Sequence, residues 1–244
     1  MISKIQSDLI DWRIVVTFVR DKNRCRHMKL RGVITGDVVG SSKIIGESRD
    51  ELLLSIRKII DNCKEKDSLL RMEFYRGDSI QIISSHPETM AHLAVLLRSK
   101  IKSCSPQRNG LWDIRLSIGI GEVSYSSKKV ATSDGEAFQL SGRNLDSIGK
   151  RRLTVTTIWD EVNEELEIST AFLDALITDW TKSQSEMIWN YFLNPEKTQA
   201  EIAQLLETSA QNVSGQLIKA KYKLVELYIN RFQELIISHN SSKA

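Results

Sequence analysis

The chain has 244 residues, of which 41% are hydrophobic and 27% are charged, an ordinary composition for a globular protein. No apolar run approaches the roughly 20 residues that a membrane-spanning helix requires, so we expect no membrane partner. The three cysteines lack the spacing of metal ligands and indicate reduced thiols, which favours a cytoplasmic protein.

The formal net charge of +3 comes from the first 27 residues, which hold six basic and three acidic side chains. Residues 28–244 are therefore neutral overall. Nucleic-acid binding would have to depend on a local cluster of cations, and the most obvious one is Lys219, Lys221, Lys223 and Arg231. We expect residues 1–27 to be an N-terminal extension, because the chain reads like the beginning of a domain from Met28 onward.

Apolar periodicity predicts alternating strands and helices up to residue 158. The predicted strands cover residues 30–39, 70–75, 79–84, 112–124 and 153–157, and the predicted helices cover residues 51–64, 87–104 and 136–148. The first six elements indicate an α+β fold built on a ferredoxin-like βαββαβ sheet with its helices on one face. From Trp159 onward every segment has a helical pattern. We therefore predict a sheet domain over residues 28–158 and an all-helical domain over residues 159–244.

Residues 198–219, TQAEIAQLLETSAQNVSGQLIK, have the pattern of a helix-turn-helix. Thr198 and Glu201 can form a capping box, and Ser209 can cap the second helix. A small Ala203 followed ten residues later by Val213 allows the two helices to cross closely.

The same segment carries two predicted apolar stripes. The members of these stripes are Ile202, Ala203, Leu205 and Leu206 in the first helix, and Val213, Leu217 and Ile218 in the second. Glu207 occupies the turn position at which a glycine often supplies a left-handed conformation, so the turn is expected to be strained or differently shaped.

Polar side chains gather near the start of the second helix, where a recognition helix contacts base edges. They are Gln211, Asn212, Ser214 and Gln216. Asn and Gln amides can form paired hydrogen bonds with adenine, while Lys219, Lys221 and Lys223 would contact phosphates. The segment resembles the helix-turn-helix of sigma factor region four and related response regulators. A helical hairpin that only packs on another part of the protein is the alternative.

Two aspartates stand beside glycines at strand ends. Asp37 closes the first strand in TGDVVGSS, and Asp78 lies in the hairpin of YRGDSIQI. Neighbouring strands in a βαββαβ sheet would bring both carboxylates to one edge, as a Mg²⁺ or Mn²⁺ site requires. Turn aspartates chosen for loop geometry are the simpler interpretation of each alone. The backbone amides of Gly40, Ser41 and Ser42 could bind a phosphate, although loop geometry explains these residues equally well.

These stretches resemble class III nucleotidyl cyclases, in which one metal aspartate follows the first strand and another sits in a Gly-Asp hairpin. RLSIGIGEV is similar to the following cyclase strand, and DGEAFQLSGRNLD to the helix that carries an asparagine and, four residues on, an arginine. These two positions are Gln139 and Arg143 here. The resemblance implies that both face the phosphates of a nucleoside triphosphate, where Arg143 would neutralise developing charge.

Over residues 28 to roughly 236 the chain resembles the SatD-like bacterial family, which joins a cyclase-like domain to a C-terminal helix-turn-helix. GDVVGSSKI, YRGDSIQ, IGIGEV and SDGEAF carry this likeness. The base-selecting lysine and aspartate of cyclases fall at Phe74 and Thr132, which cannot make the same charged contacts. The metal and phosphate parts are thus retained in the sequence, whereas the base-reading parts are not.

The sequence leaves three functions open. The first is a cytoplasmic DNA-binding regulator with a nucleotide–metal-binding domain, whose partner is double-stranded DNA. The second is an active nucleotidyl cyclase or nucleotidyltransferase with the helical domain as a regulatory module. The third is a structural dimer. Complete DNA-reading helices beside an incomplete catalytic set favour the first, and both motifs predict a homodimer.

Overall fold

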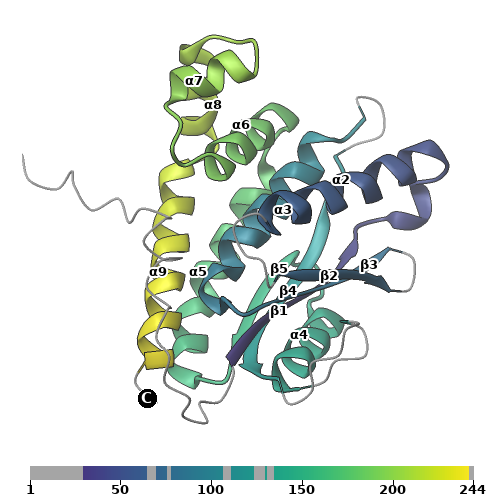
Figure 1. Cartoon of the computed structure of the whole chain (residues 1–244), viewed down its shortest axis with the longest axis vertical. Coiled ribbons are helices and arrows are strands. Elements are labelled where there is room, and N and C mark those ends of the chain that lie inside the picture. The colour runs from purple at the N-terminus through teal and green to yellow at the C-terminus, as the bar shows by residue number, and fades with distance from the viewer. Residues whose placement is uncertain are drawn as a thin grey trace, which may run out of the picture.

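The computed structural model describes residues 30–64, 70–75, 78–106, 111–123, 130 and 135–241. These residues form an α+β structure, with one five-stranded sheet, helices on both of its faces and a long helical extension (Figure 1). The predicted N-terminal extension, the hairpin turn at residues 76–77 and Thr132 lie outside the described residues. None of the described helices combines the length and the apolar character that a membrane crossing needs.

The elements follow the predicted order. They are β1 (Leu30–Val38), the 3-10 turn η1 (Ser41–Lys43), α2 (Glu47–Lys64), β2 (Arg71–Tyr75), β3 (Ser79–Ser84), the 3-10 turn η2 (Pro87–Thr89), α3 (Met90–Ser103), β4 (Ile114–Glu122), α4 (Glu136–Ser147), β5 (Leu153–Thr157), α5 (Asp160–Asp179), α6 (Lys182–Leu193), α7 (Gln199–Leu205), α8 (Ala210–Lys219) and α9 (Tyr222–Ser241). The differences from prediction are at the ends of elements: α2 begins at Glu47 instead of Glu51, and β4 is shorter at both ends.

The strands lie in the order β2-β3-β1-β4-β5. All neighbouring pairs are antiparallel except β4 and β5, which are parallel. Helices α2 and α3 cover one face, where Ile34 and Ile118 pack in the same cluster as Ile56 and Met90. Helix α4 covers the opposite face, below the sheet in Figure 1.

Glycines in β4 allow α4 to lie unusually close to the sheet. A Cβ atom on Gly119 would lie 2.3 Å from the carbonyl oxygen of Ala137 and 2.7 Å from the amide of Ser141. The hydroxyls of Thr35 and Ser141 share a 2.8 Å hydrogen bond between β1 and α4. The IGIG sequence is therefore needed for helix–sheet packing, whatever other role it has.

The sheet and the helical extension share one hydrophobic core. Leu97 of α3 belongs to the same cluster as Trp180, Trp189 and Phe192, which lie after the predicted domain boundary. Both tryptophans are buried, as the helical pattern indicates. The predicted division at residue 158 therefore does not coincide with a gap in packing.

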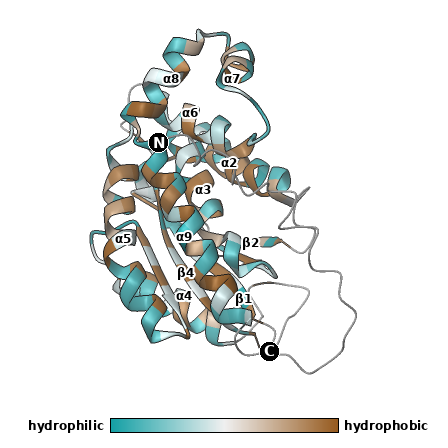
Figure 2. Cartoon of the chain, turned by 90° about the vertical axis from the view of Figure 1, so that its left-hand side faces the viewer, coloured by the Kyte–Doolittle hydropathy of each residue, from teal (hydrophilic) through white to brown (hydrophobic). Residues whose placement is uncertain are grey.

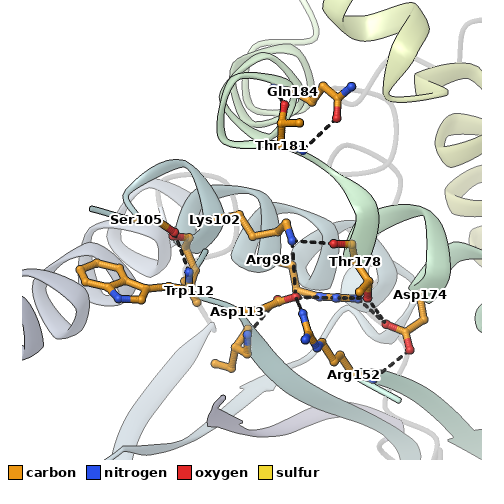
Figure 3. Close-up of polar contacts among 12 residues, drawn as sticks. Arg98, Lys102, Ser105, Trp112, Asp113, Arg152, Asp174, Thr178, Thr181 and Gln184 are labelled. Atoms are coloured by element: carbon orange, nitrogen blue, oxygen red, sulfur yellow. Dashed lines mark hydrogen bonds and ion pairs between the residues drawn. The ribbon is translucent and has the colours of Figure 1, made fainter. Parts of the chain in front are cut away.

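A buried network of charges joins the same two halves (Figure 3). Arg98 donates to both carboxylate oxygens of Asp113, at 3.0 and 2.8 Å, and to Asp174 of α5 at 2.6 Å. Arg152 donates to Asp113 at 2.7 Å, and Lys102 lies 3.8 Å from the same carboxylate. Burial alone would raise the pKa of Asp113, but hydrogen bonds and charges from these cations together hold that pKa below its usual value.

Helix α9 runs antiparallel to α5. Thr170 shares a 2.6 Å hydrogen bond with Tyr228, and Glu165 pairs with Arg231 one turn further along. Helices α7 and α8 lie at the end of the molecule away from the sheet, as Figures 1 and 2 both show. The indole nitrogen of Trp180 donates to the carbonyl of Ala220 at 3.0 Å, which anchors the end of α8 to the core.

Candidate functional site

Asp37 forms a two-pronged ion pair with an arginine of the neighbouring strand. The register places Asp37 of β1 directly opposite Arg115 of β4. Arg115 donates from Nε to Oδ1 at 2.7 Å and from Nη2 to Oδ2, so both carboxylate oxygens accept a hydrogen bond from one guanidinium. The hydrogen bonds that Arg115 donates to Asp37 raise the pKa of Arg115 above its ordinary value. The side chains remain partly open to solvent, 38% for Arg115 and 23% for Asp37.

Asp78 lies at the same end of the sheet. It directly precedes Ser79, which pairs with Asp37 across β1 and β3. Adjacent residues of a regular strand point to opposite faces, so this register places Asp78 near Asp37 along the strands but not automatically on its face. No three carboxylate, imidazole or thiolate groups of the described residues come together as a metal site.

The residues at this sheet end do not fit a divalent cation as they stand. Mg²⁺ and Mn²⁺ need carboxylate oxygens that are free to coordinate. Both oxygens of Asp37 are instead held by Arg115, whose own positive charge would repel a metal ion. A metal ion at the site inferred from Asp37 and Asp78 would therefore have to share the Asp37 oxygens with Arg115.

The candidate phosphate loop follows β1 directly. Gly40 adopts a left-handed conformation, with φ 66°, and leads into the turn η1. Within this turn the backbone amide of Lys43 donates to the Gly40 carbonyl at 2.9 Å. Ser41 is half-buried and Ser42 is exposed, so the loop lies at the surface where a ligand could reach it. The Val39 amide donates to the Asp113 carbonyl at 2.9 Å, which ties the loop to the start of β4.

Gln139 and Arg143 lie beside each other on the exposed side of α4. The two side chains share one face of α4, as their spacing predicts, with Arg143 Nη2 3.4 Å from Gln139 Oε1. Both are exposed, whereas Ala137 and Ser141 occupy the side of α4 that packs on the sheet. Within one chain, Gln139 and Arg143 thus point to solvent.

Phe74 occupies the position that the resemblance to cyclases gives to their base-selecting lysine. It lies on the α2 side of the sheet, opposite to α4. Phe74 is half-buried against the core beneath α2. The guanidinium carbon of Arg57, on α2, lies 5.3 Å from the centre of the Phe74 ring. Phe74 therefore serves packing in this chain.

Helices α7 and α8 are capped as the sequence predicts. The Thr198 hydroxyl accepts from the Glu201 amide at 3.3 Å, and the Glu201 carboxylate accepts from the Thr198 amide at 2.7 Å. The Ser209 hydroxyl accepts from the Asn212 amide at 3.1 Å. Glu207 in the turn has φ 50°, so a side chain other than glycine occupies the left-handed region.

The apolar stripes were predicted one residue too wide. Ala203 and Val213 are buried between the helices, as expected. Leu205 and Ile218 were assigned to the same stripes, but they are 57% and 61% exposed. Each lies at the edge of its helix's buried arc, where a turn of 100° per residue carries it out of the core. Ile218 therefore joins the outer surface of α8.

The predicted DNA-contacting side chains differ in how freely they could reach a partner. Gln211 and Asn212 are exposed, but the Asn212 amide donates to the Thr208 hydroxyl at 3.0 Å. Ser214 and Gln216 are half-buried. Lys223 pairs with Glu226 at 2.9 Å. Lys219 and Lys221 are exposed, and neither forms an ion pair with a described residue.

Comparison with known proteins gives only distant likenesses. No family model and no curated protein matches the chain. Among solved structures, the active GGEEF domain of a diguanylate cyclase from Vibrio cholerae matches 54% of this chain and 85% of its own, with a TM-score of 0.40 and 18% identity. A bacterial light-regulated adenylyl cyclase matches 52% of this chain and 75% of its own, with a TM-score of 0.35 and 12% identity. Similarity this low assigns neither an activity nor a ligand.

Proposed function

We propose that this protein is a DNA-binding regulator. In this proposal α7 and α8 form a helix-turn-helix, and the sheet is a ferredoxin-like, cyclase-like domain of the SatD type that binds a nucleotide. The order β4-β1-β3-β2, with antiparallel neighbours, supports the ferredoxin-like interpretation of the first four strands.

The observation that carries the proposal is the construction of the α7–α8 pair. Side chains cap both helices, and Ala203 and Val213 are buried between them. The outer surface of α8 then presents an amide, Gln211, in its first turn and a cation, Lys219, in its last turn, and Lys219 forms no ion pair with a described residue. Amides contact base edges and lysines contact phosphates in the helix-turn-helix class of DNA-binding proteins.

Selection from fragmented genomic DNA with the full-length protein tests this proposal. We expect enrichment of one sequence, arranged as two half-sites about one helical turn apart, because helix-turn-helix proteins read such sites as homodimers. Light scattering on the same preparation should show a dimer. A selection that enriches no sequence would refute the regulator and leave α7 and α8 as a docking module for another protein.

A second candidate function is a nucleotidyl cyclase or nucleotidyltransferase that uses Mg²⁺ or Mn²⁺ and a nucleoside triphosphate. It is favoured by the pairing of Asp37 with Ser79, the residue directly after Asp78, at one end of the sheet. It is opposed by the pairing of Asp37 with Arg115 and by the outward direction of Arg143. Incubating the protein with each triphosphate and either metal, followed by mass spectrometry, decides it: a cyclic or linked product would make this the leading function.

A further inference from the structure

We infer that Arg115 takes the place of a divalent cation beside Asp37, so that this end of the sheet works without metal. The inference rests on the proposed function in one respect, because it concerns the nucleotide site that the proposal assigns to the sheet. Its physical basis is the geometry of the pair itself.

The guanidinium donates one hydrogen bond to each oxygen of the carboxylate. The planar fork of an arginine matches the two oxygens of a carboxylate, and here Nε and Nη2 each take one. Asp37 and Arg115 face each other in the register of β1 and β4, so the backbone of the sheet holds them in position. Strand pairing fixes the two backbones, so only the side chains must be ordered for the pair to form.

The charge of Arg115 cannot be removed under ordinary conditions, because a guanidinium stays protonated throughout the physiological range. A divalent ion approaching Asp37 would have to displace a hydrogen-bonded cation and then remain beside it. Asp78, the other carboxylate at this end of the sheet, would have to supply most of the remaining attraction. Asp37 is therefore neutralised from within the chain.

Electron paramagnetic resonance with Mn²⁺ alone, on the full-length protein, tests the inference. We compare the wild-type protein, Arg115→Gln, Asp37→Asn and the double variant Arg115→Gln/Asp37→Asn. The matched control is Arg231→Gln, because Arg231 also holds both oxygens of one carboxylate, that of Glu165 on the helical extension. Circular dichroism and thermal midpoints establish that each variant is folded.

We expect wild type and Asp37→Asn to bind Mn²⁺ equally weakly. Arg115→Gln should bind at least about tenfold more tightly, and the double variant and Arg231→Gln should not. Mn²⁺ binding to wild type that is lost in Asp37→Asn would overturn the inference, even if Arg115→Gln failed to fold. A folded Arg115→Gln variant that binds Mn²⁺ no more tightly than wild type would also overturn it. Neither result affects the selection of DNA, so failure of this inference is distinct from failure of the regulator proposal.

Discussion

Arg98 of α3 and Asp174 of α5 are joined by a 2.6 Å hydrogen bond between fully and almost fully buried side chains. This bond crosses the boundary that the sequence predicts between a sheet domain and a helical domain. The Nε and Nη2 atoms of Arg98 donate to Asp113, at the start of β4. Helix α3, strand β4 and helix α5 are thereby fixed to one another by buried charges.

The first prediction concerns this network. Asp113→Asn keeps the shape of the side chain but leaves buried Arg98 with one carboxylate partner, Asp174, and removes the carboxylate that pairs with Lys102. Breaking a buried pair in this way costs about 3–5 kcal/mol of unfolding free energy. Urea denaturation measures it, with Glu165→Gln in the exposed Glu165–Arg231 pair as the control that should barely move the midpoint. Equal effects in both variants would contradict the prediction.

The second prediction is the pH dependence of the same effect. The folded pKa of Asp113 lies below its unfolded value, so its contribution to stability is present above about pH 4 and is lost as the pH falls through the folded pKa. The difference in thermal midpoint between wild type and Asp113→Asn should therefore be constant near neutrality and shrink under acid conditions. A difference that persists unchanged in acid would mean that Asp113 keeps its usual pKa.

The third prediction concerns the turn between α7 and α8. Glu207 has a positive φ of 50°, a conformation that costs residues other than glycine about 1 kcal/mol or more. Glu207→Gly should raise stability by about that amount, while Glu207→Ala should not, because alanine keeps the Cβ atom that causes the strain. Calorimetry of the two variants provides the comparison, and equal midpoints would show that the strain is relieved in some other way.

The fourth prediction separates phosphate contacts from base contacts. Lys219→Ala should weaken binding to all DNA sequences alike and reduce the salt slope by about one unit. Gln211→Ala should cost on the order of 1–3 kcal/mol at the selected sequence only. Asn212→Ala should affect both binding and the turn, because Asn212 also bonds Thr208. Lys150→Ala, on an exposed turn after α4, is the control for loss of charge alone.

The fifth prediction assigns a role to Ile218, whose side chain is exposed on α8, the candidate recognition helix. An apolar side chain in the major groove contacts the 5-methyl group of thymine. Replacing thymine by deoxyuracil within the selected site should therefore weaken binding of wild type but not of Ile218→Ser. Leu227→Ser, equally exposed on α9, is the control. Wild-type binding that is indifferent to the methyl group would place Ile218 outside the base contacts.

The parts of the molecule that the sequence predicts well are those decided by neighbours along the chain. The caps at Thr198 and Ser209 depend on residues three positions away. The alternation of apolar and other residues along β4 indicates directly which side of the strand is buried. The Asp37–Arg115 pair joins residues 78 positions apart, and it depends on a strand register that no local pattern encodes. Arg115 falls on the same side of its strand as Ser117, so alternation gives the side but not the partner.

The buried charges could not be predicted for a related reason. Arg98 and Lys102 lie on a helix whose apolar pattern is clear, and charged residues within such a pattern ordinarily reach solvent. They are buried because α5 returns over α3 and supplies Asp174. The outward positions of Leu205 and Ile218 depend on the exact phase of two short helices, which a single turn of apolar residues does not define.

The hydrophobic core that the sheet shares with the helical extension limits which segments of the chain could be exchanged by recombination. The end of α8 is bonded to Trp180 through the carbonyl of Ala220, and Trp180 packs in the same cluster as Leu97 of the sheet half. A recombination event at residue 158 would separate side chains that exclude water only together. Helices α7 and α8 can therefore diversify by surface substitution, residue by residue, more readily than by transfer to another scaffold.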